Sequence, residues 1–345
     1  MFIKLIIAFG LFCVLTHLQQ FDINICLWYT NRQSKGMIEM PINEHGMNSD
    51  YVSYFPIEEY VAKIDLTPEL LDHLELTSNE FDKYMNKLGE YNREHIVEYW
   101  IYLLYRELES SHHIENREFC AKSIVENGVF FEHMAINHKR IHELHNFVTS
   151  GYMEPTFNYR NVPVNVSHIN SDGTEDIFWR GVNPEDVSRF MRDFIKVYKQ
   201  NKIALLYSNP FLVSSLMHLL FVRIHPYTDG NGRTSRVIHN IKFTEAINRL
   251  YGMKLKISPL NLSESILLNK ITYNKRINQI YFDLDHDTND AINAWFDFIL
   301  DMADEQIYRA SNMLKKIPRR FLISQEEALN GSKGLGKVLK GHSGK

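Results

Sequence analysis

The chain has 345 residues, of which 44% are hydrophobic and 23% are charged, and its formal net charge is -4. This composition is typical of a soluble protein with one large or two modest domains. The small negative charge provides no overall basic field, so we expect no nucleic-acid partner, and any anion site must be local. The three cysteines are few, odd in number and far apart, which argues against a disulfide framework and against a zinc site.

The first segment, residues 1–49, begins with an apolar run at residues 1–18 that contains one lysine, Lys4. The run resembles part of a signal peptide or a short membrane anchor, yet it is shorter than the ~20 residues that a spanning helix needs. It also lacks an obvious small-residue cleavage site. A membrane-directing segment, a disordered segment and an ordinary apolar helix all stay open, and the cytoplasm is the favoured location.

Residues 50–144 are expected to form a helical N-terminal region. Thr67 is followed by a proline and an acid, which is the pattern of a helix start. Thr77 and Glu80 form a second pattern of this kind, a capping box. Apolar residues at spacings of three and four then predict a longer helix over 93–109.

The clearest β-strand pattern in the sequence lies between Tyr159 and Gly181. Valines alternate with other residues, a turn sequence follows at 170–173, and an apolar run resumes at 177–179. This pattern predicts a β-hairpin. The alternating valines are Val162, Val164 and Val166.

Helical periodicity fills most of the expected core domain, residues 145–306. Asparagine followed by proline, at Asn183 and Asn209, marks two of the helix starts, and Gly252 marks one helix end. The expected helices cover about 183–198, 209–222, 232–250, 262–281 and 289–313.

Residues 307–345 are expected to hold the end of the last helix and a flexible basic tail. Within the tail, Gly331 to Lys337 almost spells a phosphate-binding P-loop. Val338 stands where that motif needs a serine or threonine, and no strand precedes it. We therefore reject a P-loop here.

The densest polar chemistry lies at 224–236, which reads IHPYTDGNGRTSR between two apolar helical stretches. Gly230 and Gly232 let the backbone turn tightly, and the N–H groups at the start of the next helix point into the turn. This arrangement makes an anion cradle that the helix dipole reinforces. Arg233 and Arg236 are three residues apart, so both project from one side of the first turn toward the same phosphates.

Two further groups give this stretch a reactive character. Asp229 is a hard carboxylate that suits Mg²⁺ carried by a polyphosphate. His225 ends the preceding helix, where it can take a proton from an incoming hydroxyl. Each residue alone has an ordinary structural explanation, as a cap, a turn or a solvated face, but no packing demand needs all of them together. The combination indicates nucleotidyl or phosphoryl transfer.

The stretch from His225 to Arg236 resembles the signature of the Fic family, written H-P-F-x-[DE]-G-N-G-R-x-x-R, and departs from it only at Tyr227. An aromatic exchange of this kind should still anchor the loop in the core. The resemblance implies an all-α fold, a Fic-type helical bundle with a small β-hairpin flap. It also implies ATP and Mg²⁺ as cofactors and transfer of AMP to a serine, threonine or tyrosine hydroxyl of a target protein.

The resemblance also implies a role for each site residue. His225 would be the general base, Asp229 the metal ligand, and Asn269 a further contact of the nucleotide. The remaining nucleotide-binding residues would be Gly230, Asn231 and Gly232 in the anion hole, and Arg233 and Arg236 on the β- and γ-phosphates. Gly230 in place of alanine argues against the phosphocholine-transferring branch, and the sequence N-G-R argues against the kinase-like branch that reads A-N-K-R.

Two other stretches gain meaning from the resemblance. The hairpin occupies the place of the family's flap, so its Val162, Val164 and Val166 would dock an extended target segment by strand addition. Upstream, Ser111 to Asn116 match the inhibitory pattern [ST]-x-x-x-E-[GN]. Its glutamate, Glu115, would pair with Arg236 and disturb the placement of the γ-phosphate.

The sequence leaves three functions open. Protein adenylylation restrained by Glu115 leads, and removal of AMP through the same glutamate is the alternative within enzymology. A catalytically silent adaptor that binds nucleotide is disfavoured, because His225, Asp229 and both arginines are intact. The expected partners are target proteins with an accessible hydroxyl, and a second copy of the chain is possible.

Overall fold

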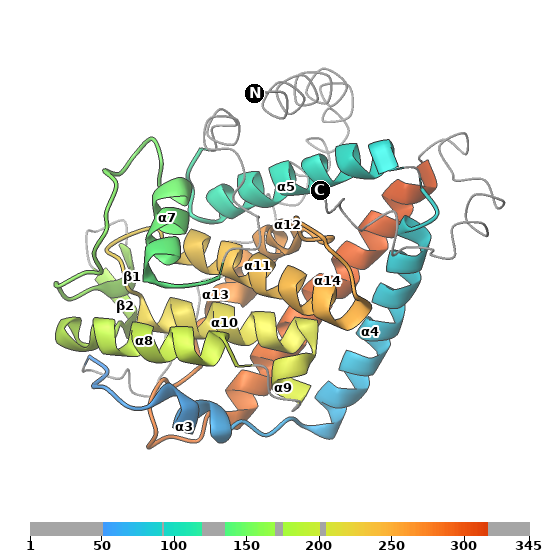
Figure 1. Ribbon diagram of the computed structural model, residues 1–345. Coiled ribbons are helices and arrows are strands. Elements are labelled where there is room, and N and C mark those ends of the chain that lie inside the picture. The colour runs from blue at the N-terminus through green and yellow to red at the C-terminus, as the bar shows by residue number, and fades with distance from the viewer. Residues whose placement is uncertain (1–50, 92, 119–134, 170–174, 201–204, 317–345) are drawn as a thin grey trace.

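The computed structural model describes residues 51–91, 93–118, 135–169, 175–200 and 205–316. Within these ranges the chain is mainly helical and carries one two-stranded sheet (Figure 1). The predicted all-α class with a small hairpin is therefore confirmed. Among the helices of these ranges, none combines the length and the apolar character needed to cross a bilayer. The apolar run at 1–18 and the P-loop-like sequence lie outside the described residues.

The centre of the bundle is the pair α10 (Pro210–Ile224) and α11 (Asn231–Tyr251), joined by a short loop (Figure 1). Every residue of α10 is buried, as expected for a helix that is apolar on all sides and surrounded by others. The polar stretch singled out above consists of the loop between the two helices and the first residues of α11. The surrounding helices are α5 (Arg93–Ile114) and α7 (His138–Val148) beside α11, and α8 (Val187–Tyr198), α9 (Leu205–Ser208) and α14 (Asn289–Lys316) beside α10.

The helix α4 (Pro68–Leu88) begins as the sequence predicts, with the Thr67 hydroxyl accepting a hydrogen bond from the backbone of Leu70. The second predicted helix start, the capping box at Thr77 and Glu80, is wrong. Thr77 is fully buried inside α4, where it continues the apolar stripe that packs against α14. Burial of this stripe outweighs the local capping preference.

Several predicted element bounds differ from the structure. The helix expected over 93–109 continues to Ile114, and the start expected at Asn183 is a short 3₁₀ turn, Pro184–Asp186, that leads into α8. Two short helices, α3 (Ile57–Ala62) and α9, have no prediction. The domain boundary expected at residue 144 falls inside α7, so residues on both sides of it belong to one continuous element.

The helix expected over 262–281 is interrupted. It consists of α12 (Leu262–Leu268) and α13 (Lys270–Asn278), which meet at Asn269. Asn269 has φ -114° and ψ 28°, and its amide donates a hydrogen bond to the Ser265 carbonyl. The side-chain amide of Asn269 therefore caps α12. The helix ends there although apolar residues continue at helical spacing into α13.

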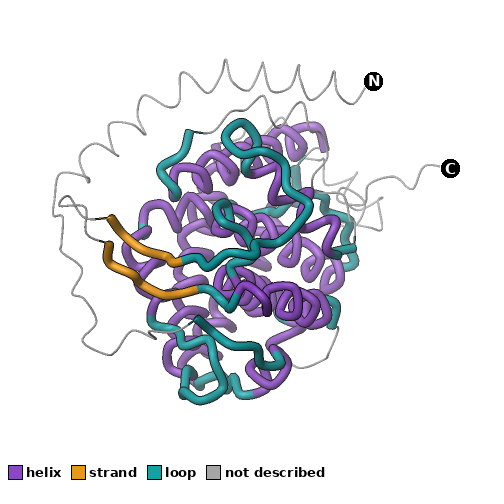
Figure 2. The backbone as a smooth tube through the Cα atoms, turned by 90° about the vertical axis from the view of Figure 1, so that its left-hand side faces the viewer, coloured by secondary structure: helices purple, strands orange, loops and turns teal. Residues whose placement is uncertain are grey.

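The hairpin consists of β1 (Asn165–Ile169) and β2 (Glu175–Arg180), which are antiparallel and lie on the surface of the helical body (Figure 2). Asn165 pairs with Arg180, and Ile169 pairs with Glu175. The predicted strand position of Val162 and Val164 is wrong, because both precede β1 and Val162 is 45% exposed. Pro163, between them, has no N–H for a strand ladder.

Candidate active site

The loop between α10 and α11 starts and ends with left-handed backbone. His225 has φ 53° and ψ 61°, and Gly230 has φ 80°. The Asn231 side chain closes the loop, since it accepts from the Tyr227 N–H at 2.9 Å and donates to the Tyr227 carbonyl at 2.8 Å. The amide of Asn231 is thus used within the loop, and only its backbone N–H can contribute to the anion hole that the resemblance implies.

Tyr227, the one departure from the family signature, anchors this loop in the core. Its side chain is 2% exposed and its ring stacks on His145 with 3.7 Å between centroids. The extra hydroxyl forms a hydrogen bond of 2.7 Å with Nδ1 of His142. His145 also donates from Nε2 to the Asp229 carbonyl at 2.9 Å, so two histidines of α7 hold the loop. The sequence analysis did not identify either histidine.

The start of α11 can bind an anion. Helix geometry leaves the first N–H groups of α11 without acceptors in the helix, and Gly230 supplies no side-chain cap. A Cβ at Gly230 would lie 2.5 Å from Cγ2 of Thr149, so glycine is required there for space as well as for its positive φ. The cradle that the sequence predicts is therefore present as backbone geometry.

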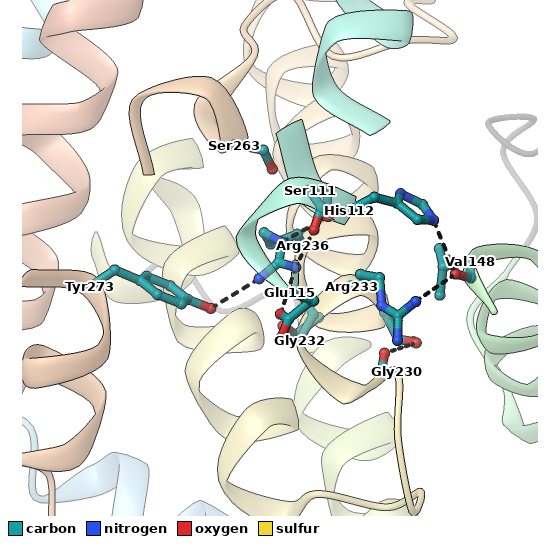
Figure 3. Close-up of polar contacts among 12 residues, drawn as sticks. Ser111, His112, Glu115, Val148, Gly230, Gly232, Arg233, Arg236, Ser263 and Tyr273 are labelled. Atoms are coloured by element: carbon teal, nitrogen blue, oxygen red, sulfur yellow. Dashed lines mark hydrogen bonds and ion pairs between the residues drawn. The ribbon is translucent and has the colours of Figure 1, made fainter. Parts of the chain in front are cut away.

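Arg236 is 2% exposed and fixed from three elements (Figure 3). Nε donates to the Ser111 hydroxyl and Nη2 to the Ser111 carbonyl, both at 2.8 Å. Nη2 also donates to Oε1 of Glu115 at 2.8 Å, and Nη1 lies 3.4 Å from the Tyr273 hydroxyl. The ion pair with Glu115 that the resemblance implies is thus present, and Ser111 takes part through its hydroxyl and its backbone.

Glu115 lies against the cradle itself. A Cβ at Gly232 would be 2.4 Å from Oε1 of Glu115, so the carboxylate touches the backbone where an anion would bind. Burial alone would raise the pKa of Glu115, but the charge and hydrogen bond of Arg236 outweigh burial and hold the pKa below its usual value. Next to it, Asn116 has φ 54° and accepts a hydrogen bond from Lys270 Nζ at 3.1 Å.

Arg233, also in the first turn of α11, is fully buried and has partners different from those of Arg236 (Figure 3). Its guanidinium lies over the Tyr152 ring at 4.6 Å, and Nη1 contacts the Val148 carbonyl at 3.4 Å. Nη2 donates to Oδ1 of Asp229 at 3.2 Å. Burial lowers the pKa of Arg233 to about 10, which still leaves it charged at neutral pH.

Asp229 is the single carboxylate of the loop and is 44% exposed. Besides Arg233, it pairs with Arg117, whose Nη2 lies 3.4 Å from Oδ2. No group of three or more histidine, cysteine or acidic side chains in the described ranges could hold a metal ion alone. Mg²⁺ is often bound by one or two carboxylates together with substrate phosphates, so the donor set fits a Mg²⁺ that arrives with a nucleotide.

His225 is in the form that a general base needs. Its Nδ1 lies 3.1 Å from the Val222 carbonyl, which can only accept, so Nδ1 carries the hydrogen and Nε2 keeps its lone pair. Burial lowers the pKa of His225 to about 4. The imidazole is therefore neutral over the physiological pH range.

Arg160 is a site residue that the sequence analysis missed. Its Nε donates to the His225 carbonyl at 2.7 Å, while Nη1 binds the Val162 carbonyl at 2.8 Å and Nη2 the Val182 carbonyl at 2.6 Å. Gly181 leaves room for this guanidinium, since a Cβ there would lie 2.7 Å from Nη2. One arginine thus ties both ends of the hairpin to His225, and no local sequence pattern marks it.

Two of the predicted site groups are not brought into these contacts. The Asn269 amide is bound to the Ser265 carbonyl and lies 3.5 Å from Sδ of Met302, so its role toward a nucleotide stays a prediction. Among the three flap valines, only Val166 lies in a strand. The docking role of the flap also stays a prediction.

Comparison with known proteins shows what part of the chain is similar to. A sequence model of the Fic/DOC family matches residues 135–241. A Fido domain-containing protein of Dictyostelium discoideum is 34% identical over 79 residues, which are 21% of this chain and 54% of that protein. The chain thus spans about half the length of this curated relative.

Comparison with solved structures gives the following similarities. A variant of Fic-1 from C. elegans has a TM-score of 0.50 and 15% identity, with 76% of each chain covered. A Fic family protein from Desulfovibrio desulfuricans has a TM-score of 0.48 and 15% identity, covering 84% of this chain and 87% of that chain. At such identity the likeness concerns the fold alone.

The matched region contains α7, the hairpin, α10 and the first half of α11. These elements carry His225, Asp229, both arginines and the cradle, whereas Glu115 lies upstream of the match. Residues 135–241 are therefore similar to the Fic/DOC family in sequence, and the site residues from His225 to Arg236 lie within this region.

Proposed function

We propose that this chain transfers AMP from ATP to a hydroxyl side chain of a target protein. The observation that carries the proposal is the neutral imidazole of His225 beside the anion cradle of α11. Its Nδ1–H is bound to the Val222 carbonyl, so the free lone pair of Nε2 is available to a substrate proton. A base next to a phosphate cradle fits attack by a hydroxyl on phosphorus.

In the proposed reaction, the target hydroxyl oxygen attacks the α-phosphorus and the bond to the β-phosphate breaks. His225 Nε2 takes the hydroxyl proton, and pyrophosphate leaves. The N–H groups at the start of α11, together with Arg233 and Arg236, bind the phosphates and stabilise the charge on the leaving group. Asp229 would hold Mg²⁺, which neutralises phosphate charge when it is bound.

We further propose that Glu115 restrains this reaction. Arg236 cannot bind a phosphate fully while it donates to Glu115, and the carboxylate lies in contact with Gly232 at the cradle. Its ionised form, favoured by Arg236, also repels a γ-phosphate. A displaced γ-phosphate would misalign the α-phosphate for in-line attack, which costs on the order of 10²-fold in rate.

The test uses ATP labelled on the α-phosphate, with a cell lysate as the source of targets. Glu115→Gly should raise labelling of targets and of the chain itself by at least about 10²-fold. Glu115→Asp should raise labelling less than Glu115→Gly does, because the shorter acid keeps a weaker contact with Arg236. Glu115→Gly combined with His225→Ala should be inactive, since loss of a general base costs about 10²–10⁴-fold. Wild-type labelling by Glu115→Gly would refute the restraint, and label transfer by the double variant would refute the base.

Removal of AMP is the second candidate. The Glu115 carboxylate contacts Arg236 and lies against Gly232 at the cradle, a position from which it would hold an attacking water molecule. The test is to add wild-type chain to self-labelled Glu115→Gly chain and to follow free AMP. Release by the wild type, but not by Glu115→Gly alone, would establish removal as the favoured direction.

A further inference from the structure

Trp179, on strand β2, contacts both His225 and a buried arginine. Its ring meets the His225 ring in a T-shaped contact, with 5.1 Å between centroids and 81° between planes. The Arg223 guanidinium lies over the Trp179 ring at 4.4 Å. Trp179 is 7% exposed, so it is packed on both sides.

Arg223 is the second contact of the Trp179 ring. It is 5% exposed, and its Nε and Nη1 have no hydrogen-bond partner among the residues that the structure describes. A guanidinium with few polar partners gains most from the face of an indole ring, an attraction that grows when both groups are desolvated. Because Arg223 lies two residues before His225 on α10, the indole is fixed relative to the base.

We propose that Trp179 is a positioning residue for His225, and that it couples strand β2 of the hairpin to the direction of the Nε2 lone pair. The inference rests on the proposed function. The Nδ1 hydrogen bond to Val222 holds one edge of the imidazole but leaves the ring free to tilt about that bond. The Trp179 ring removes this freedom through direct contact.

The backbone supports the same coupling. Arg160 bonds the His225 carbonyl and the carbonyls of Val162 and Val182, so the stem of the hairpin and His225 are joined at main-chain level as well. A target segment that pairs with the hairpin would therefore meet a base already aligned with it. Misplacement of a reacting group by about 1 Å can cost about 10²-fold in rate.

Trp179 also shields the imidazole from water. Burial is the main cause of the lowered pKa of His225, which is about 4. Loss of the indole should open this side of the ring to solvent and move the pKa of His225 upward, toward its ordinary value of about 6.5. This effect can be measured without nucleotide or target.

The test compares Trp179→Ala, Trp179→Phe and the control Phe178→Ala, each in the Glu115→Gly background. Phe178 is the neighbour of Trp179 on β2, is partly buried, and lies unpaired at a bulge between the pairs Val166–Trp179 and Ser167–Ile177. Trp179→Ala should lower kcat by about 10–10²-fold and leave the KM for ATP within about two-fold. Trp179→Phe should restore most of kcat, and Phe178→Ala should keep it.

The second readout is the NMR titration of the His225 imidazole in the apo chain, assigned by its loss in His225→Asn. The pKa should rise in Trp179→Ala and stay near that of the parent in Phe178→Ala. If Trp179→Ala does not fold, Trp179→Leu is used in both measurements instead, because leucine keeps an apolar group in the space. Unchanged kcat together with an unchanged titration would overturn the proposal. If no variant transfers AMP, the proposed function fails, and the titration still decides whether Trp179 covers His225.

Discussion

Glu115 and His225 are titratable residues of the site, and the surroundings of each side chain set its charge state. Glu115 stays ionised because Arg236 outweighs the cost of its burial. His225 stays neutral because burial, which lowers its pKa, outweighs the hydrogen bond to the Val222 carbonyl, which raises it. An ionised carboxylate bound to Arg236 therefore coexists with a neutral imidazole at His225.

The neutral state of His225 predicts a flat pH profile. Its pKa is lowered to about 4, so the base form persists as pH falls until the pH approaches that value. We expect single-turnover transfer by Glu115→Gly to change less than about two-fold between pH 6 and pH 8, as far as this base is concerned. An imidazole of ordinary pKa, about 6.5, would lose about three quarters of its base form at pH 6, and such a loss would contradict the assignment.

The hydroxyl of Tyr227 predicts a stability effect without loss of activity. Tyr227→Phe recreates the family signature but removes the hydrogen bond to His142. The free energy of unfolding should fall by about 0.5–1.5 kcal/mol, the usual net value of one hydrogen bond. Denaturant unfolding and the transfer assay measure the two quantities. A loss of transfer larger than about two-fold would mean that the hydroxyl serves the chemistry, beyond anchoring the loop.

At the scale of elements, the segment that follows α5 brings two side chains of opposite charge into contact with two residues of the site. Glu115 pairs with Arg236, and two residues later Arg117 pairs with Asp229. Asn116, with its positive φ and its bond to Lys270, forms the turn between them. The segment thus presents a carboxylate where a phosphate would bind and a cation where Mg²⁺ would bind.

This arrangement predicts that Arg117 competes with Mg²⁺. Arg117 is half exposed, and an exposed ion pair contributes about 0.2–1 kcal/mol. Arg117→Ala should therefore lower the Mg²⁺ concentration that half-saturates ADP binding by about 1.5–5-fold, measured by calorimetry. Arg117→Lys, which keeps the charge, is the matched control. An unchanged Mg²⁺ dependence in Arg117→Ala would show that the pair with Asp229 has no effect on the metal.

At the scale of the whole molecule, α4 and α14 pack against each other although they are far apart in sequence (Figure 1). His73 on α4 bridges two carboxylates of α14, with Nδ1 2.7 Å from Asp297 and Nε2 3.1 Å from Asp304. Burial alone would lower the pKa of His73, but the two hydrogen bonds outweigh burial and raise it. Asp301 and Arg276 are the other charged groups nearby.

The bridge predicts stability that depends on pH. Because the folded-state pKa of His73 is raised, the contribution is complete below its unfolded pKa of about 6.5 and is lost as pH rises through the folded-state value. The difference in Tm between wild type and His73→Gln should thus be largest at pH 5.5–6 and shrink toward pH 9. A difference that is constant over this range would show that His73 acts only through packing.

Local sequence was sufficient for features that depend on nearby residues. The cradle follows from Gly230, Gly232 and a helix start, and the cap at Thr67 follows from its own tripeptide. The contact of Glu115 with Arg236 spans 121 positions, and only the resemblance to a family pointed to it. Thr77 shows the opposite case, since a sound local signal was overridden by burial against α14.

Contacts that form only when distant segments fold together had no local pattern in the sequence. Arg160 bonds only backbone carbonyls around His225, so no partner side chain in the sequence marks it. Trp179 reads as an ordinary apolar strand residue, and its contact with His225 needs the hairpin to fold onto the end of α10. His145 likewise acts through a carbonyl, that of Asp229. Contacts to main-chain atoms leave no pattern in the sequence, which explains why Arg160 and His145 escaped prediction.

The pairing of Glu115 with Arg236 also has an order in time. The carboxylate precedes the arginine by 121 residues, and ribosomes add about 5–20 residues per second, so Glu115 is synthesised roughly 6–24 seconds earlier. Ser111, which supplies two more acceptors to Arg236, is also made first, and Tyr273 follows afterwards. The nascent chain therefore contains Glu115 before Arg236 is synthesised. The ion pair can form as soon as the domain folds.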